Sequence, residues 1–205
     1  MEAGISLAGG HSIDSPEPIF GLAVTGHVRL ENLKRNDTAT EGCHLLLTKP
    51  LGVGILSTAQ KQGKLKAQHS KLASECMEKL NKIGYDLASI KEISAITDVT
   101  GFGLLGHLTE MCEGSNLSAE LIFDKIPRIK EVDEYLALGC VPGGTERNWD
   151  SYGSQVELTN NKYKQLLCDP QTSGGLLIAV QDEGLEKVMQ MLREKNYECQ
   201  PFGRL

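Results

Sequence analysis

The stretch Ile96-Thr97-Asp98-Val99-Thr100-Gly101-Phe102-Gly103-Leu104-Leu105-Gly106-His107 decides the fold of this chain. An apolar lead-in predicts a short strand over 93–96, and Asp98 follows at its end. Glycines then open a predicted helix with apolar residues at helical spacing, Leu104, Leu105, Leu108, Met111 and Cys112. The free N–H groups of a helix start attract anions, and Thr97 and Thr100 add hydroxyls. A carboxylate beside a phosphate-sized anion invites a divalent metal, so Asp98 is the predicted metal ligand.

Residues 101–106 also match G-x-G-x-x-G, the dinucleotide fingerprint, and Glu120 or Asp124 lies near the distance of a ribose-binding acid. The fingerprint should follow a continuous apolar strand, whereas polar residues interrupt 91–94 and a helix-like segment precedes it. Asp98 would also place a negative charge beside the pyrophosphate. Nicotinamide binding is therefore disfavoured, and glycines that serve only close packing remain an alternative.

Composition excludes several classes of protein. A chain of 205 residues can bury one good core, and 27 acidic against 21 basic residues give a net charge of −6. No run of Lys or Arg exceeds two, so the footprint of a nucleic-acid-binding protein is missing. No apolar run reaches the 18 or so residues of a membrane span. An acidic protein that handles phosphates would need a metal ion.

The six cysteines indicate a reducing compartment. They are Cys43, Cys76, Cys112, Cys140, Cys168 and Cys199, widely spaced and without a C-x-x-C pair, which disfavours a zinc site or a tight disulfide framework. Four of them adjoin apolar strands or lie on apolar helix faces, so we expect buried, unreactive thiols in a cytoplasmic protein.

The chain begins with two predicted strands, 5–8 and 20–28, around Gly9-Gly10-His11-Ser12 and an acidic, proline-rich turn. About 35 residues cannot bury a core of their own, so we expect further chain or another subunit to complete them, and the N-terminus looks truncated. A polar linker over 30–42 leads to the main domain.

In the main domain, strands and helices alternate, which predicts an α/β (α+β) fold. Strands are expected at 44–48 and 176–180, an edge strand at 117–123, and a further strand from Tyr197. Helices are expected at 55–59, at 72–80 with a Ser70 cap and an end at Gly84, at 132–136, and at 185–192. Residues 143–148 are predicted as a loop that presents the guanidinium of Arg147 and the amide of Asn148.

Four glycine pairs or glycines next to hydroxyls unite the chain: Gly9-Gly10-His11-Ser12, Thr100-Gly101, Gly143-Gly144-Thr145 and Thr172-Ser173-Gly174-Gly175. Each offers bare N–H and O–H donors that suit phosphate oxygens, although none is a Walker loop. Glycine pairs often serve turn geometry alone, and four in one chain favour the binding interpretation. His11 and His107 lie beside such turns, and His107 could equally face the core.

Together, Ala8–Asp14, Thr97–His107, Pro142–Asn148 and Asp169–Gly175 resemble motifs of the selenophosphate synthetase family, in the same order and over nearly the whole chain. That family belongs to the aminoimidazole ribonucleotide synthetase superfamily, which pairs an N-terminal dimerising, ATP-binding α/β domain with a C-terminal α/β domain. The resemblance implies that residues 1–36 are a remnant of the first domain and that 37–205 form the second.

The resemblance also implies an activity, in which ATP, selenide and water give selenophosphate, AMP and phosphate. It implies a homodimer through the N-terminal strands, a nucleotide site that includes Gly9, Gly10, His11 and Ser12 across the dimer, and Mg²⁺ on Asp98. Further contacts to phosphate or intermediate are expected from Thr97, Thr100, Arg147, Asn148, Thr172 and Ser173.

The chain departs from the family pattern in one respect. The reactive cysteine or selenocysteine, the catalytic lysine and the further magnesium-binding aspartates of the family are not found in these residues, so no catalytic residue is predicted here. The chain by itself is expected to be inactive. Two alternatives stay open: another ATP-dependent enzyme of the superfamily, of the ribonucleotide cyclo-ligase or carbamoyl-phosphate-processing type, and a non-catalytic nucleotide-binding remnant.

Overall fold

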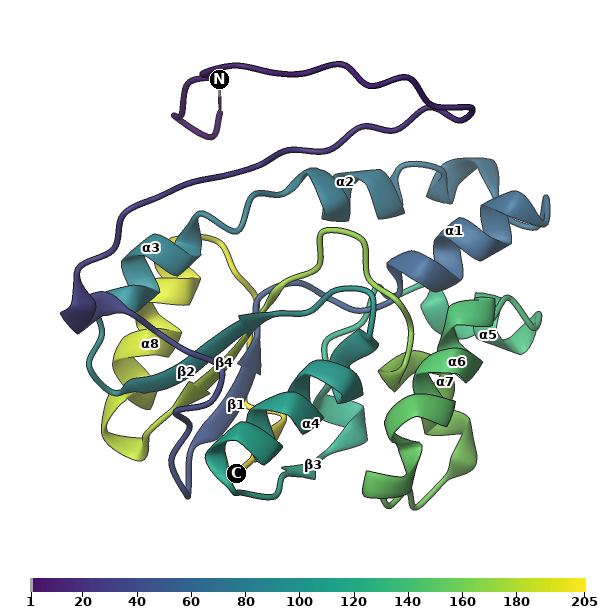
Figure 1. Ribbon diagram of the computed structural model, residues 1–205. Helices are drawn as coiled ribbons and strands as arrows, with labels where there is room; N and C mark the ends of the chain where they lie inside the picture. Colours follow the sequence, from purple (N-terminus) through teal and green to yellow (C-terminus); the bar gives the residue numbers. More distant parts are fainter. Residues whose placement is uncertain (1) are drawn as a thin grey trace.

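Five strands form one antiparallel sheet in the computed structural model, which describes residues 2–205 (Figure 1). The order is β2-β4-β1-β5-β3, with β1 at His44–Leu47, β2 at Ile93–Asp98, β3 at Glu120–Leu121, β4 at Leu176–Val180 and β5 at Gly203–Arg204. All neighbouring strands are antiparallel. The strands predicted at 44–48, 93–96 and 176–180 are confirmed. The predicted edge strand does lie at the edge, although only Glu120 and Leu121 pair, and the strand expected from Tyr197 forms only at Gly203–Arg204.

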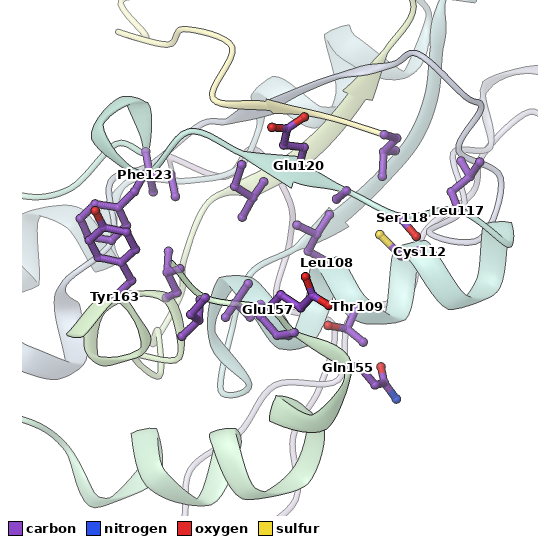
Figure 2. Close-up of a pocket in the computed structure, with 18 of the residues that line it drawn as sticks. Leu108, Thr109, Cys112, Leu117, Ser118, Glu120, Phe123, Gln155, Glu157 and Tyr163 are labelled. Atoms are coloured by element: carbon purple, nitrogen blue, oxygen red, sulfur yellow. The ribbon is translucent and has the colours of Figure 1, made fainter. Parts of the chain in front are cut away.

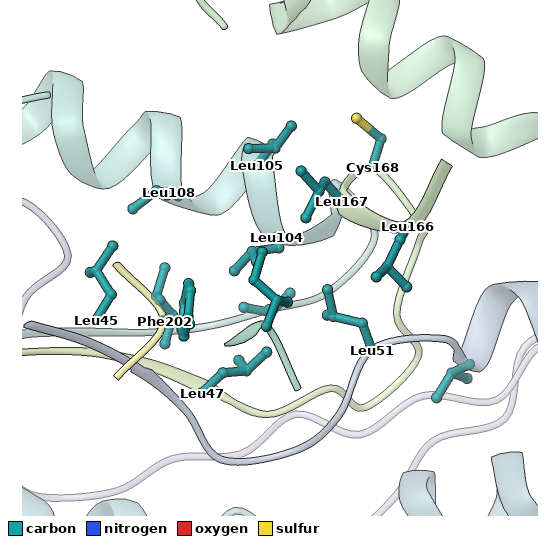
Figure 3. Packing of buried hydrophobic residues seen from close by; sticks show 14 of the residues in the cluster. Leu45, Leu47, Leu51, Leu104, Leu105, Leu108, Leu166, Leu167, Cys168 and Phe202 are labelled. Carbon is teal, nitrogen blue, oxygen red and sulfur yellow. The ribbon is translucent and has the colours of Figure 1, made fainter. Parts of the chain in front are cut away.

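Strand side chains alternate between two apolar layers, one on each face of the sheet. On β1, Leu45 and Leu47 enter the larger cluster, which includes Leu104 and Phe202 and is seen in Figure 3, while Leu46 enters the smaller cluster. Because successive strand residues point to opposite faces, a run of three leucines requires helices on both sides. The sheet is therefore a buried middle layer.

Eight α-helices lie around the sheet in the part of the chain that the structure describes. They are α1 (Val53–Lys61), α2 (Leu72–Glu78), α3 (Ile83–Ala88), α4 (Gly103–Ser115), α5 (Val132–Ala137), α6 (Gly143–Tyr152), α7 (Lys164–Leu167) and α8 (Asp182–Glu194). Residues of α3 and α8 build the smaller apolar cluster. Residues of α1, α4, α5 and α7 enter the larger one.

Two predictions for helical segments are wrong. The helix expected to end at Gly84 ends at Glu78, because Lys79 adopts an extended conformation, and Gly84 lies inside α3. The loop expected over 143–148 is the first part of α6. A glycine pair suggests a loop, but here it occupies the first helical turn, where Gly144 packs so closely on Pro170 that a Cβ would lie 2.7 Å from its Cγ.

The strands predicted at 5–8 and 20–28 do not form within this chain. No residue from 2 to 29 belongs to a strand, and Figure 1 shows this segment running outside the sheet. Its apolar side chains are solvent-exposed, including Phe20 at 90% and Leu7 at 85%. A strand needs a hydrogen-bonded neighbour, and the described residues provide none for this segment.

Candidate functional site

The candidate site begins where β2 ends. Asp98 is the last residue of the strand and is paired with Leu176, the first residue of β4. Its carboxylate is exposed and has no hydrogen bond or ion pair with any residue from 2 to 205. The next residue continues the pairing, since the N–H of Val99 donates to the carbonyl of Gly175 at 2.8 Å. Asp98 therefore lies beside the loop that precedes β4, with a free carboxylate.

Helix α6 holds the turn after Asp98 from inside the protein. The Asn148 amide nitrogen donates to the carbonyls of Gly101 at 2.8 Å and Cys168 at 3.0 Å. One helical turn later, the Tyr152 hydroxyl donates to the carbonyl of Phe102 at 2.5 Å. Both side chains are buried. The two amide hydrogens of Asn148 are thus engaged with the backbone, so the structure gives Asn148 a supporting place behind the turn.

His107 faces the interior and fixes Thr100. Its Nε2 accepts the Thr100 backbone N–H at 3.0 Å and lies 3.1 Å from the Thr100 hydroxyl oxygen. Burial lowers the pKa of His107, which favours the neutral ring with Nε2 as the acceptor. The Thr100 N–H is therefore already bound, whereas the N–H groups of Gly101 and Phe102 have no acceptor among the described residues.

The loop before β4 has its carbonyls tied back and its N–H groups free. The carbonyl of Ser173 accepts from Lys49 Nζ at 2.6 Å, that of Gly174 from Asn81 Nδ2 at 2.8 Å, and that of Gly175 from Val99. Ser173 adopts a left-handed conformation with φ of 52°. No residue from 2 to 205 accepts a hydrogen bond from the N–H groups of 172–175. Successive N–H groups without an acceptor, next to a left-handed residue, are the backbone pattern of an anion-binding nest, and Thr172 and Ser173 are exposed whereas Gly174 and Gly175 are buried; we refer to residues 172–175 as the nest.

Asp169 and Gln171 close the start of α1. Gln171 Oε1 accepts the N–H groups of Gly52 at 3.2 Å and Val53 at 3.3 Å, and Asp169 Oδ2 accepts the N–H of Gly54 at 3.2 Å. Burial raises the pKa of Asp169 to about 7, against the opposing hydrogen bond from Gln171. These side chains satisfy donors that helix starts otherwise leave unpaired, so these three N–H groups are already occupied.

The other predicted site residues lie in different parts of the structure. Arg147 is exposed on α6, whose first turn packs on Pro170, and has no ion pair within the described chain. The residues from Gly9 to Ser12 are all exposed and belong to the N-terminal segment that runs outside the sheet (Figure 1). The structure thus brings together Asp98 and the nest at 172–175, flanked by Thr97 and Thr100, and leaves Gly9, Gly10, His11 and Ser12 outside.

Sequence reasoning missed the residues that support this site. Tyr152, Gln171, Asn81 and Lys49 act through backbone carbonyls or N–H groups of distant segments, and such contacts leave no local pattern. The one available signal was a charged Lys49 directly after an apolar strand.

Magnesium would find only one ligand of the expected kind here. In residues 2–205 no group of three or more His, Cys, Asp or Glu side chains is close enough to hold a metal ion. The free carboxylate of Asp98 fits a hard cation that takes oxygen ligands, and the remaining ligands would have to come from outside the described residues.

A wide groove lies elsewhere, between α4, β3 and the segment 155–163 (Figure 2). It has a volume of about 1590 Å³, and Phe123 stacks on Tyr163 at one end. None of the predicted site residues lines it. The groove is therefore separate from the candidate site.

All six cysteines are free thiols, as the sequence predicted. Burial raises the pKa of Cys76, Cys112 and Cys168, and raises that of Cys199 to about 11. These thiols lack the lowered pKa of a reactive cysteine. Within residues 2–205, no helix combines the length and apolar character needed to span a membrane.

Comparison with known proteins agrees with the fold and the motifs. Two similar curated relatives, from Aeromonas hydrophila and Pasteurella multocida, are each named "Selenide, water dikinase" and are 58% and 56% identical over 204 residues. The alignments cover 100% of this chain but only 59% and 58% of those proteins. The chain thus spans a little over half the length of the curated relatives it matches.

Solved structures share the fold at low sequence identity. The hydrogenase maturation protein HypE in complex with ATP has a TM-score of 0.63 at 18% identity, covering 87% of this chain and 47% of that one. Thiamine-monophosphate kinase from Stenotrophomonas maltophilia has a TM-score of 0.59 at 16% identity, covering 83% and 49%. Residues 40–205 match the family described as AIR synthase related protein, C-terminal domain. The chain belongs to this family.

Proposed function

We propose that this chain supplies the C-terminal part of an enzyme that converts ATP, selenide and water into selenophosphate, AMP and phosphate. The single observation that carries the proposal is the pairing of Asp98 with the residue next to the 172–175 nest, which sets a free carboxylate beside free N–H donors. Relatives named "Selenide, water dikinase" with at least 56% identity support this activity over the others.

In phosphoryl transfer the protein mainly positions groups and neutralises charge. Asp98 would hold Mg²⁺, which screens phosphate charge when bound. The N–H groups of 172–175 would bind phosphate oxygens, with the exposed Thr172 hydroxyl beside them. The Ser173 hydroxyl donates to the Met77 carbonyl at 2.8 Å, so Ser173 would contribute through its backbone. Arg147 would add a cation that is not neutralised by any described carboxylate.

Other parts of the proposed enzyme lie outside the site formed by Asp98 and residues 172–175. Phe20, Leu22 and Val24 are exposed at alternate positions, which supports pairing of this segment in a homodimer. In that dimer Gly9, Gly10, His11 and Ser12 would serve the nucleotide site across the interface. We place the nucleophile, the catalytic lysine and further magnesium ligands in the portion of the relatives that this chain does not cover. Six free thiols support a cytoplasmic location.

The test replaces Asp98 with Asn in this chain joined to the uncovered portion of the Aeromonas hydrophila relative. Asn keeps the shape and one oxygen but removes the charge, and two unit charges 4 Å apart interact by roughly 4 kcal/mol at an effective dielectric of 20. Because other ligands share the metal, we expect at least a roughly tenfold loss of magnesium-dependent AMP formation from ATP and selenide, with an unchanged unfolding midpoint. Asp150→Asn, an exposed aspartate on α6, is the matched control.

Each outcome separates the hypotheses. Activity within a few-fold of the parent would show that the charge of Asp98 is not needed to hold the metal ion. ADP formed with a ribonucleotide in place of AMP formed with selenide would indicate another enzyme of the superfamily. ATP binding without turnover by the joined protein would indicate a non-catalytic remnant.

A further inference from the structure

Lys49 is a buried lysine without a carboxylate partner. The residue is 2% exposed, and no Asp or Glu oxygen of the described chain lies within 4.0 Å of its ammonium. Its hydrogen bond goes to the carbonyl of Ser173, at 2.6 Å. Burial and the neighbouring Lys79 cation both lower the pKa of Lys49, while the Cys76 thiol acts in the opposite direction. A buried charge is normally paired, so this one needs an explanation.

The position of Lys49 under the loop before β4 explains its unpaired charge. The loop before β4 passes directly over it, since a Cβ on Gly175 would lie 2.4 Å from the Lys49 backbone nitrogen and 2.9 Å from its Cβ. The ammonium binds the carbonyl in the middle of the loop, at the residue with positive φ. The C=O and N–H of a peptide point in opposite directions. A cation bound to the Ser173 carbonyl therefore leaves the adjoining N–H group directed away from Lys49. The same cation adds positive potential behind that N–H group.

We propose that Lys49 is a positioning residue for phosphate binding, whose buried ammonium holds the 172–175 nest in shape and supplies the charge that draws a phosphate group to it. The proposal deepens, and rests on, the function proposed above. Lys49 acts through the loop and is not itself placed against the phosphate. A bound dianion would offset the buried charge that the protein leaves uncompensated.

A structural role and the proposed role predict opposite results for Lys49→Met. Methionine has a similar length and no charge; it removes the cost of burying an unpaired ammonium but leaves the Ser173 carbonyl without its donor, and these two effects on stability oppose each other. Under the proposal, Lys49→Met folds and binds phosphate more weakly than the parent. A purely structural lysine would instead lower stability and leave phosphate binding as it was.

The experiment follows the backbone amide signals of 172–175 by NMR while the 205-residue chain is titrated with inorganic phosphate. We expect these signals to shift in the parent and the apparent Kd to rise at least about tenfold in Lys49→Met. Lys49→Gln keeps an N–H donor without the charge, and should fall between the two. The matched control is Lys34→Met. Lys34 also donates to backbone carbonyls, those of Ile90 and Ile93, both at 2.8 Å, and burial lowers its pKa. Its ammonium contacts the first residue of β2, at the opposite end of that strand from Asp98.

The outcomes distinguish this inference from the proposed function. If phosphate shifts none of the 172–175 signals in the parent, the phosphate site itself is wrong. If the parent and Lys49→Met bind phosphate equally, the site stands and the role of Lys49 is refuted. If Lys49→Met does not fold, Lys49→Gln decides: equal phosphate binding by Lys49→Gln and the parent would refute the role of Lys49. Weaker binding in Lys34→Met by the same factor would show a nonspecific effect of net charge.

Discussion

Asp169 should make the stability of this protein fall as the pH rises toward neutrality. Its side chain is fully buried, Oδ2 accepts from Gln171 Nε2 at 2.7 Å and from Gly54, and Oδ1 has no hydrogen-bond partner among the described residues. Burial disfavours the charged form and raises the pKa from 3.8 to about 7. Between these values the folded protein keeps a proton that the unfolded chain releases, so unfolding becomes easier with increasing pH.

The magnitude follows from the two pKa values. Each pH unit between them is worth about 1.4 kcal/mol. From pH 4.5 to pH 7.5 this group alone should remove roughly 3 kcal/mol from the free energy of unfolding. In Asp169→Asn, an amide oxygen at the Oδ2 position can accept the same two hydrogen bonds and does not titrate. The variant should therefore gain roughly 3 kcal/mol relative to the parent over this range.

Urea unfolding followed by circular dichroism at several pH values from 4.5 to 7.5 measures the difference. Comparison of parent and variant cancels the carboxylates they share, among them Asp37 and Asp182, whose pKa values are lowered by hydrogen bonds to Arg35 and His44. Asp150→Asn is again the control and should follow the parent. A constant difference between parent and Asp169→Asn across the whole range would refute the reasoning.

Two further predictions concern the turn and the N-terminal segment. Tyr152→Phe leaves the part-buried Phe102 carbonyl without its donor, and should cost about 1 kcal/mol in urea unfolding and speed hydrogen exchange in 100–106. Tyr135→Phe changes another buried tyrosine and should leave that exchange unchanged. Replacing Phe20 and Leu22 with Ser should weaken self-association in sedimentation velocity, because both side chains are exposed in this chain; an unchanged distribution of species would contradict dimerisation through this segment.

Local pattern was sufficient for the main strands and the position of Asp98. Strand β4 is five apolar residues between turn signals, and the motif from Ile96 to His107 joins a strand, a turn and a helix, so short-range spacing specified both. The helix at 143–152 was missed because its buried face depends on Thr145, Asn148 and Tyr152, which are polar or amphipathic and gain their burial from a distant loop. The predicted strands before residue 29 depended on pairing that this chain does not provide.

Local sequence patterns could not predict contacts between distant segments of the chain. Asn148 was predicted to contact phosphate or an intermediate; in the structure its amide nitrogen donates to the carbonyls of Gly101 and Cys168, and no local pattern encodes where those two carbonyls lie in space. Lys49 was unremarked for the same reason, since its partner is more than a hundred residues away in the chain. The sequence therefore indicates candidate binding loops, while only the fold shows which residues hold these loops in place.

The order of strands in the sheet has a consequence for how the chain folds. Strand β4 lies between β1 and β2, and pairs His44 with Val180 and Asp98 with Leu176, so the strand that joins the other two long strands is the last of the three to be synthesised. Until then β1 and β2 have no central neighbour, and a large loop must close before either ladder can form. High contact order of this kind slows folding. On a ribosome, the sheet and the nest at its edge would assemble only after nearly the whole chain had emerged.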